Sequence, residues 1–131
     1  MGEFTLGQKA SISKTILEQD VLQFAELVED YNPIHIDKTF AKNSIFGRRI
    51  VHGMLGSSLI SAVLGTKLPG PGAIYLSQIL QFLAPVFIGD TIKAEVEVIK
   101  IRNDKPIITL KTNCLNQGNE LVLTGEAVLK V

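Results

Sequence analysis

The chain has 131 residues, of which 46% are hydrophobic and 20% are charged, with 13 Lys and Arg against 13 Asp and Glu. This composition is typical of one soluble globular domain spanning residues 1–131, and the lack of net charge speaks against a nucleic-acid partner. The single cysteine, Cys114, excludes an intramolecular disulfide and a cysteine metal cluster, and it favours a reducing, cytoplasmic location.

The first predicted element is an amphipathic helix over residues 18–29. Its apolar residues recur at intervals of three and four, which is the period of a helix with one buried face. The Asn32-Pro33 step that follows disfavours helical geometry, so residues 30–36 are expected to form an extended loop with a fixed path. Asp37 is then expected to cap a short helical turn.

A second helix is predicted over residues 52–66. Its apolar residues again follow a helical period, while its other face carries glycine, serine and alanine and no acidic or strongly basic residue. Such a helix is usually buried all round. It falls short of the roughly 20 apolar residues that a membrane span needs, so no membrane partner is expected. The Pro- and Gly-rich run at 68–72 ends it.

After this helix the hydrophobic period changes to two, which is typical of strands with one covered face. The alternating segments are 92–98, 108–113 and 121–129, and turn signals separate them at 89–90, 103–106 and 117–119. The adjacent Val98 and Ile99 break the alternation and indicate a β-bulge. The pattern predicts an antiparallel meander with the helix at 52–66 laid across it, which is an α+β architecture.

Two titratable residues of the loop form a candidate acid–base pair. Asp30 and His35 flank the rigid Asn32-Pro33 step, and His35 is one of only two histidines in the chain. At neutral pH a carboxylate is ionised and an imidazole is mostly neutral, so both can accept hydrogen bonds from one water. The alternative is that Asp30 caps a turn and His35 is a satisfied loop histidine. His52 is interpreted as a histidine that begins the helix or packs against it.

The motif Asp30-x-Asn32-Pro33-x-His35-x-Asp37, followed by Phe46-x-x-x-Ile50-x-His52-Gly53-Met54, resembles the signature of the MaoC-like, R-specific enoyl-CoA hydratases. The resemblance runs through most of the chain, and one departure is Glu29, where many relatives have glycine. It implies the hotdog fold, in which a curved antiparallel sheet wraps around a long central helix. It also implies reversible syn addition of water to trans-2-enoyl-CoA, giving (R)-3-hydroxyacyl-CoA, by a homodimer with acyl-CoA at or near the interface.

The resemblance also implies roles for individual residues. Asp30 is expected to act as the general base, while His35 orients the water and shares in proton transfer. The Gly53 N–H, at the positive end of the helix, is expected to stabilise an enolate oxygen; the alternative is that Gly53 only permits tight packing. The other residues expected to contribute to the substrate site are Asn32, as support for the loop, and Ser57, Ser61 and Leu64. A core role explains Leu64 equally well.

No metal or cofactor is expected, because two histidines without a cysteine or carboxylate array make a poor metal site and no nucleotide-binding motif is present. Arg48, Arg49 and Lys67 lie near elements that would face the phosphates of coenzyme A, but they are interpreted as solvated surface.

Three other functions remain open at this point. They are a 3-hydroxyacyl-[acyl-carrier-protein] dehydratase, a hotdog acyl-CoA thioesterase and a non-catalytic acyl-CoA-binding module. Hotdog thioesterases typically place a carboxylate on or beside the central helix, and residues 53–66 contain none. The Asp30–His35 pair argues against a module without catalysis.

Overall fold

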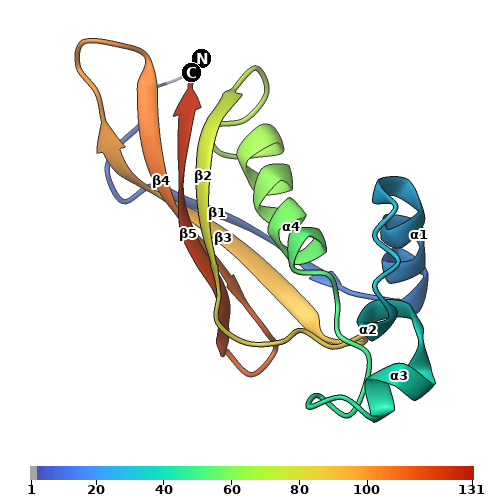
Figure 1. Cartoon of the computed structure of the whole chain (residues 1–131). Coiled ribbons are helices and arrows are strands. Elements are labelled where there is room, and N and C mark those ends of the chain that lie inside the picture. The colour runs from blue at the N-terminus through green and yellow to red at the C-terminus, as the bar shows by residue number, and fades with distance from the viewer. Residues whose placement is uncertain (1–2) are drawn as a thin grey trace.

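The computed structural model describes residues 3–131, so Met1 and Gly2 of the predicted 1–131 domain lie outside the described residues. The elements in chain order are β1 (Lys9–Thr15), α1 (Glu18–Val28), α2 (Pro33–Ile36), α3 (Lys38–Lys42), α4 (Gly53–Thr66), β2 (Ile74–Phe82), β3 (Thr91–Ile101), β4 (Ile107–Leu115) and β5 (Leu121–Lys130). The five strands form one curved antiparallel sheet with α4 along one face, while α1, α2 and α3 gather at one end (Figure 1).

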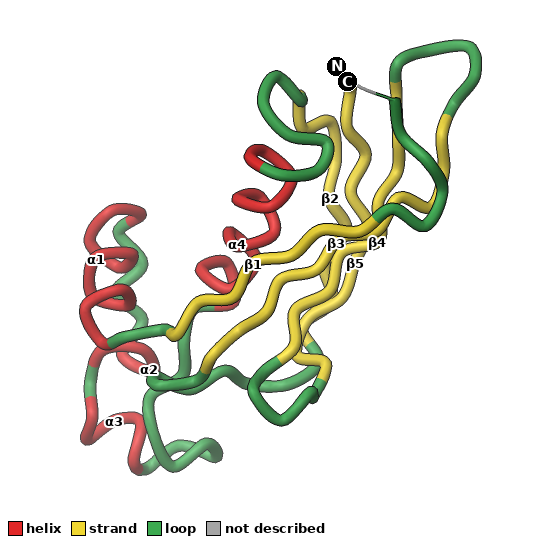
Figure 2. The backbone as a smooth tube through the Cα atoms, turned by 180° about the vertical axis from the view of Figure 1, so that it is seen from behind, coloured by secondary structure: helices red, strands yellow, loops and turns green. Residues whose placement is uncertain are grey.

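The strands follow the order β1-β3-β4-β5-β2, so the predicted meander is confirmed for β3, β4 and β5. The predicted bulge is confirmed as a register shift between Val98 and Lys100. The sequence pattern does not predict the edge strands: β1 pairs with β3, and β2 pairs with β5. Figure 2 shows the same sheet from behind, with α1, α2 and α3 beyond the end of α4.

The hydrophobic core lies between α4 and the face of the sheet that it covers. Val96 of β3 and Leu110 of β4 are fully buried, and they belong to one core cluster with Ile60 and Val63 of α4. Full burial of one such side chain stabilises the fold by about 1.5–3 kcal/mol. The apolar residues of the meander therefore lie on the side of the sheet that faces α4, and the polar residues that alternate with them lie on the other side.

The predicted helix over 52–66 is confirmed as α4, but the expectation that it is buried all round is wrong for this chain. Met54 is 58% exposed, and Ser58 and Ser61 on the same side are also exposed. One sheet can cover only one side of a helix, so the uncharged outer side of α4 has no cover within residues 3–131. None of the helices within those residues has the length and apolar character required to cross a membrane.

The expectation of an extended loop over residues 30–36 is wrong from Pro33 onward, where α2 begins. Pro33 takes the first helical position, where its missing N–H would have no intrahelical partner and its fixed φ suits a helix. Asn32 alone keeps the geometry expected before a proline, and its Oδ1 accepts a hydrogen bond from the Ile34 N–H at 3.2 Å. The Asp37 cap is confirmed, since its Oδ1 accepts from the Phe40 N–H at 3.0 Å.

Glu29 ends α1 in the left-handed conformation, with φ 62° and ψ 29°. Glycine adopts this conformation without steric cost, whereas another residue type bears roughly 1–2 kcal/mol. The backbone geometry explains why glycine suits this position. Glu29 adopts the left-handed conformation that suits glycine. This departure from the family pattern therefore leaves the path of the backbone from α1 to Asp30 unchanged.

Because Gly125 of β5 has no side chain, a side chain of β2 can pass over it and reach β4 on the other side. It lies opposite Leu80 of β2 and Thr112 of β4. The Gln78 Nε2 of β2 donates to Thr112 Oγ1 at 2.9 Å and to the Ile79 carbonyl at 2.8 Å, so this amide crosses over Gly125. A Cβ atom at position 125 would overlap the Ile79 carbonyl oxygen, and only glycine fits without moving β2.

Candidate active site

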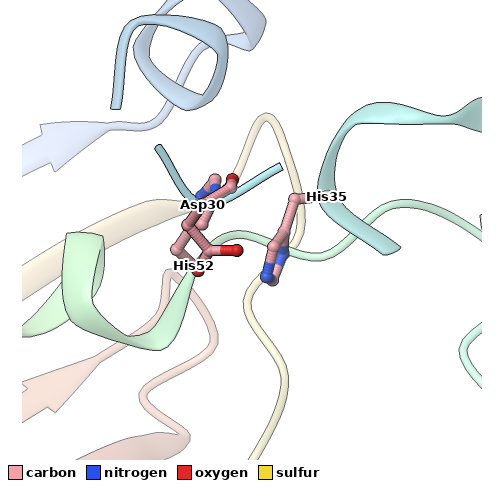
Figure 3. A group of neighbouring side chains, drawn as sticks. All are labelled: Asp30, His35 and His52. Atoms are coloured by element: carbon pink, nitrogen blue, oxygen red, sulfur yellow. The ribbon is translucent and has the colours of Figure 1, made fainter. Parts of the chain in front are cut away.

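The side chains of Asp30, His35 and His52 meet where the α1–α2 turn, α2 and the start of α4 come together (Figure 3). Each offers one nitrogen or oxygen atom, and these three atoms all lie within 4.8 Å of one another. Asp30 is exposed, whereas both histidines are buried. The two residues expected to form the acid–base pair are therefore neighbours in space, with the second histidine beside them.

Asp30 has a structural role as well as a free oxygen. Its Oδ1 accepts a hydrogen bond from the Asn32 N–H at 3.2 Å, which stabilises the turn between α1 and α2. Its Oδ2 forms no hydrogen bond within residues 3–131. The turn-capping role considered as the alternative thus coexists with an oxygen that remains available to accept a proton.

The hydrogen bond of His35 fixes its neutral tautomer. His35 Nδ1 lies 2.7 Å from the Ile50 carbonyl oxygen, and because a carbonyl only accepts, Nδ1 must carry the proton. The neutral ring therefore presents an unprotonated Nε2. Burial lowers the pKa of His35 below its ordinary value of 6.5; His52 acts in the same direction, while the Ile50 carbonyl and Asp30 oppose the shift. Neutral His35 is thus the prevailing form at pH 7.

His52 precedes the first residue of α4 and is 2% exposed, as expected for a histidine that begins the helix and packs there. Its ring stacks on His35, with centroids 3.9 Å apart and planes 28° apart. Its Nε2 donates to the Asp30 carbonyl oxygen at 3.1 Å. His52 therefore contacts both members of the acid–base pair, a link that its place in the sequence does not predict. Its Nδ1 is buried without a hydrogen-bond partner within residues 3–131.

Gly53 begins α4 next to this group. Within residues 3–131 the N–H groups of Gly53 and Met54 have no acceptor, because the first bonded N–H groups are those of Leu55 and Gly56, both to the His52 carbonyl. A Cβ atom at Gly53 would lie 2.7 Å from the Phe82 ring. The helix start thus presents a free donor, and the absence of a side chain there is also required by packing.

Two large hollows adjoin the start of α4. The first, the serine hollow, has a volume of about 430 Å³ and is lined by Met54, Ser57, Ser58, Ser61, Tyr75, Leu76, Ser77, Gln78 and Leu80. The second, the apolar hollow, has a volume of about 390 Å³ and is lined by Phe46, Ile50, Gly53, Phe82, Leu83, Ala84 and Pro85. Both lie against β2 or the segment that follows it.

The structure separates the residues expected at the substrate site. Ser57 and Ser61 both line the serine hollow. Leu64 is 1% exposed, belongs to the core cluster and does not line this hollow. Asn32 caps α2 and so supports the loop, but its side-chain oxygen already accepts a hydrogen bond from the Ile34 N–H. Leu64 is therefore a core residue, because its side of α4 faces the sheet.

A family model described as MaoC like domain matches residues 4–118 of the chain. The chain belongs to the MaoC-like family. An (R)-specific enoyl-CoA hydratase of Aeromonas caviae is 54% identical over 126 residues, covering 96% of this chain and 94% of the relative. An (R)-specific enoyl-CoA hydratase of Rhodospirillum rubrum is 50% identical over 125 residues, covering 95% of this chain and 86% of the relative.

The solved structure of the A. caviae (R)-hydratase involved in PHA biosynthesis matches this MaoC-like chain with a TM-score of 0.97 at 52% identity. The match covers 100% of this chain and 99% of that structure. The predicted hotdog fold is confirmed.

The Asp30, His35 and His52 group of this MaoC-like chain does not have the geometry of a metal site. An imidazole binds a metal through a lone pair in its ring plane, and the two ring planes are stacked rather than directed at a common point. One nitrogen of each ring is already a donor, to the Ile50 carbonyl and to the Asp30 carbonyl. The arrangement suits proton transfer better than metal binding.

Sequence reasoning missed four polar residues of the serine hollow, Ser58, Tyr75, Ser77 and Gln78, of which Tyr75 and Gln78 have the longest side chains. The Tyr75 hydroxyl donates to Gln78 Oε1, and burial raises the pKa of Tyr75 above its ordinary value of 10.0. Both residues lie on β2, which shows little alternation of burial in this chain. A period-two pattern could not find this strand, so it could not find its polar residues either.

Proposed function

We propose that the protein is an (R)-specific enoyl-CoA hydratase, a hydro-lyase that adds water reversibly to trans-2-enoyl-CoA and gives (R)-3-hydroxyacyl-CoA. The observation that carries this proposal is the approach of the Asp30 carboxylate to the ring of His35, whose Nε2 is unprotonated, beside a free N–H at Gly53. The two hydratase relatives support the same reaction. The proposed unit is one catalytic domain over residues 1–131, working in the cytoplasm with Cys114 reduced.

Asp30 and His35 both act as acceptors toward one water molecule. The water donates one O–H to the Asp30 carboxylate and the other to His35 Nε2, which leaves an oxygen lone pair directed at C3 of the substrate. Asp30 takes one proton while the oxygen bonds to C3, and the charge that develops on the thioester oxygen accepts a hydrogen bond from the Gly53 N–H. The proton then passes from the pair to C2 on the same face, with His35 sharing in the transfer.

The acyl chain is proposed to occupy the serine hollow, which begins one residue beyond Gly53. Ser57 and Ser61 line its α4 side. Asn32 contributes indirectly by holding the start of α2, and Leu64 contributes through the core beneath the helix. The substrate thus lies along the outer side of α4, where the single chain leaves it uncovered.

Crotonyl-CoA tests the reaction directly. The wild-type protein is expected to remove the conjugated enoyl absorbance and to release a product that chiral analysis identifies as (R)-3-hydroxybutyryl-CoA. His35→Ala is expected to lose roughly 10²–10⁴-fold in rate, because it removes one of the two acceptors for the water. Release of free thiol without hydration would instead indicate a thioesterase, and absence of any turnover would refute the proposal.

The pH dependence of the reaction follows from the lowered pKa of His35. Only the neutral ring has an Nε2 that accepts from water, so kcat/KM is expected to fall as the pH decreases and His35 gains a proton. The midpoint of this acid limb is expected below 6.5, the ordinary value, because burial favours the neutral form. Initial rates with crotonyl-CoA between about pH 5 and 8 measure it. A midpoint above 6.5 would show that the buried environment does not act on His35 in this way.

The protein is also proposed to act as a homodimer in which β2 of one copy joins β2 of the other. β2 is an edge strand, and apolar side chains on it and just beyond it are exposed, including Ile74, Leu76, Ile79, Phe82 and Leu83. An unpaired edge of this length attracts another strand. Pairing along β2 would place a second copy beside the open side of α4 and close the serine hollow.

Leu76→Lys is expected to convert the dimer to a monomer. Leu76 is half exposed and lines the serine hollow, so a charge there would be desolvated in the proposed interface but solvated in a lone chain. Light scattering after gel filtration should give twice the chain mass of 14.3 kDa for the wild type and the single mass for the variant. Ile45→Lys is the matched control, because Ile45 is 95% exposed in the loop after α3. A monomeric wild type would contradict the proposed dimer.

A further inference from the structure

Four basic side chains surround one surface hollow at the end of the molecule that carries His35. This basic hollow has a volume of about 360 Å³ and is lined by Lys38, Lys42, Gly47, Arg48 and Arg49. It gathers four of the 13 basic residues of a chain whose net charge is zero. Four basic side chains therefore lie together, although Arg48 and Arg49 are interpreted from the sequence as solvated surface. Lys67 lies apart from this hollow and donates to the Ser11 carbonyl at 2.7 Å.

The two arginines of the basic hollow are held in position. The guanidinium carbon of Arg48 lies 3.7 Å from the centroid of the Phe87 ring, and Arg49 Nη2 lies 3.4 Å from Glu18 Oε2, with the Arg49 side chain only 10% exposed. Within residues 3–131, Lys38, Lys42 and Arg48 form no ion pair. Three of the four positive charges thus lack a carboxylate partner, and two of the four side chains are already ordered.

The basic hollow is joined to the catalytic group by short stretches of chain. Lys38 is three residues from His35, so their Cα atoms lie within about 11 Å. Arg49 precedes Ile50, whose carbonyl accepts from His35 Nδ1. The apolar hollow lies between them, since it is lined by Gly53 at the start of α4 and by Phe46 and Ile50, which flank the Gly47–Arg49 segment. Figure 1 shows α2, α3 and the loop before α4 together at this end.

We propose that the basic hollow binds the phosphates of the 3′-phospho-ADP part of coenzyme A, while the uncharged pantetheine arm follows the apolar hollow to Gly53. The inference rests on the proposed hydratase function and extends it to recognition of the carrier. Guanidinium groups bind phosphate oxygens in pairs and lysines add point charges, so these four residues match a compact polyanion. A concave site of this size suits a nucleotide better than the broad acidic surface of a carrier protein.

The test compares substrates with and without the nucleotide. In Lys38→Gln/Lys42→Gln, kcat/KM for crotonyl-CoA is expected to fall roughly 10–100-fold, mainly through KM, because two charge-assisted contacts are lost. Crotonyl-pantetheine carries no phosphate, so its kcat/KM should stay within about twofold of the wild-type value. The KM for crotonyl-CoA should also rise with salt in the wild type and less so in the variant.

Lys100→Gln/Lys130→Gln is the matched control. It removes the same charge from exposed lysines in the last two residues of β3 and β5, and should leave both substrates unaffected. The end of β5 is at the C-terminus, at the opposite end of the sheet from α2 and α3 (Figure 1). An equal fall for both thioesters in the Lys38/Lys42 variant, or no fall for crotonyl-CoA, would overturn the inference. A fall confined to crotonyl-[acyl carrier protein] would overturn it too, in favour of a protein carrier.

Calorimetry with free coenzyme A separates this inference from the proposed function. Coenzyme A is expected to bind the wild type and to bind the Lys38/Lys42 variant roughly 10–100-fold more weakly. If that result is obtained while no thioester is turned over, the hydratase proposal falls and the carrier site stands. If coenzyme A binds both proteins equally or not at all, the carrier site falls whatever the turnover.

Discussion

Asp30→Asn is expected to lower kcat for crotonyl-CoA hydration by roughly 10²–10⁴-fold, with little change in thermal stability. The amide keeps the size of the carboxylate, and its oxygen can still accept from the Asn32 N–H, so the turn after α1 should persist. What is lost is the carboxylate oxygen that is proposed to take the proton from water. Loss of enoyl absorbance measures the rate, and circular dichroism during heating measures the stability.

Asp37→Asn provides the control for this substitution. Asp37 is a carboxylate of the same motif that accepts from the Phe40 N–H as the cap of α3, and asparagine caps a helix about as well. This variant should retain both rate and stability. If Asp30→Asn kept more than about a tenth of the wild-type rate, Asp30 would not be the general base.

Gly125→Ala is expected to destabilise the fold by at least about 3 kcal/mol, which corresponds to a fall in Tm of roughly 10 °C. The new methyl group would overlap the Ile79 carbonyl and crowd the Gln78 amide. Relief requires β2 to move away from β5, which breaks the Gln78 to Thr112 hydrogen bond at the least. Thermal unfolding followed by circular dichroism measures the change.

Gly65→Ala is the control, because it adds the same methyl group at a position where there is space for it. Gly65 lies in the last turn of α4, and a Cβ atom there would meet nothing within 4 Å. Alanine in a helix is more favourable than glycine by about 0.5–1 kcal/mol, so Tm should stay the same or rise. A Gly125→Ala protein that unfolds at the wild-type temperature would show that β2 adjusts at no cost.

The centre of the fold could be predicted from the sequence because burial there is one-sided and regular. β3 and β4 alternate between the core and the outside, and the lack of charge on α4 marks it as the helix beneath them. The edge strands could not be predicted in the same way. β1 is mostly polar, and β2 is largely exposed along its length, so neither displays a covered and an uncovered face. Strands without this contrast carry no period-two signal.

The sequence likewise predicts only part of the candidate site. Asp30 and His35 are five residues apart on one rigid segment, so the motif alone predicts that they meet. The contacts of His52 depend on α4 being placed against the α1–α2 turn, which is a property of the whole fold. The basic hollow likewise combines α3 with a later loop. Helical period alone does not say which side of α4 meets the sheet, so it leaves Leu64 open between the substrate site and the core.

Two hydrogen bonds, from His52 Nε2 to the Asp30 carbonyl and from His35 Nδ1 to the Ile50 carbonyl, close the stretch between Asp30 and His52 at its base. Residues 36–49, between these two hydrogen-bonded pairs, include α3 and all four basic residues of the basic hollow. The two hydrogen bonds hold Asp30, His35 and the start of α4 together without any contact from α3. In the proposed hydratase, changes in residues 36–49 would alter the recognition of coenzyme A and leave Asp30, His35 and the Gly53 N–H in place.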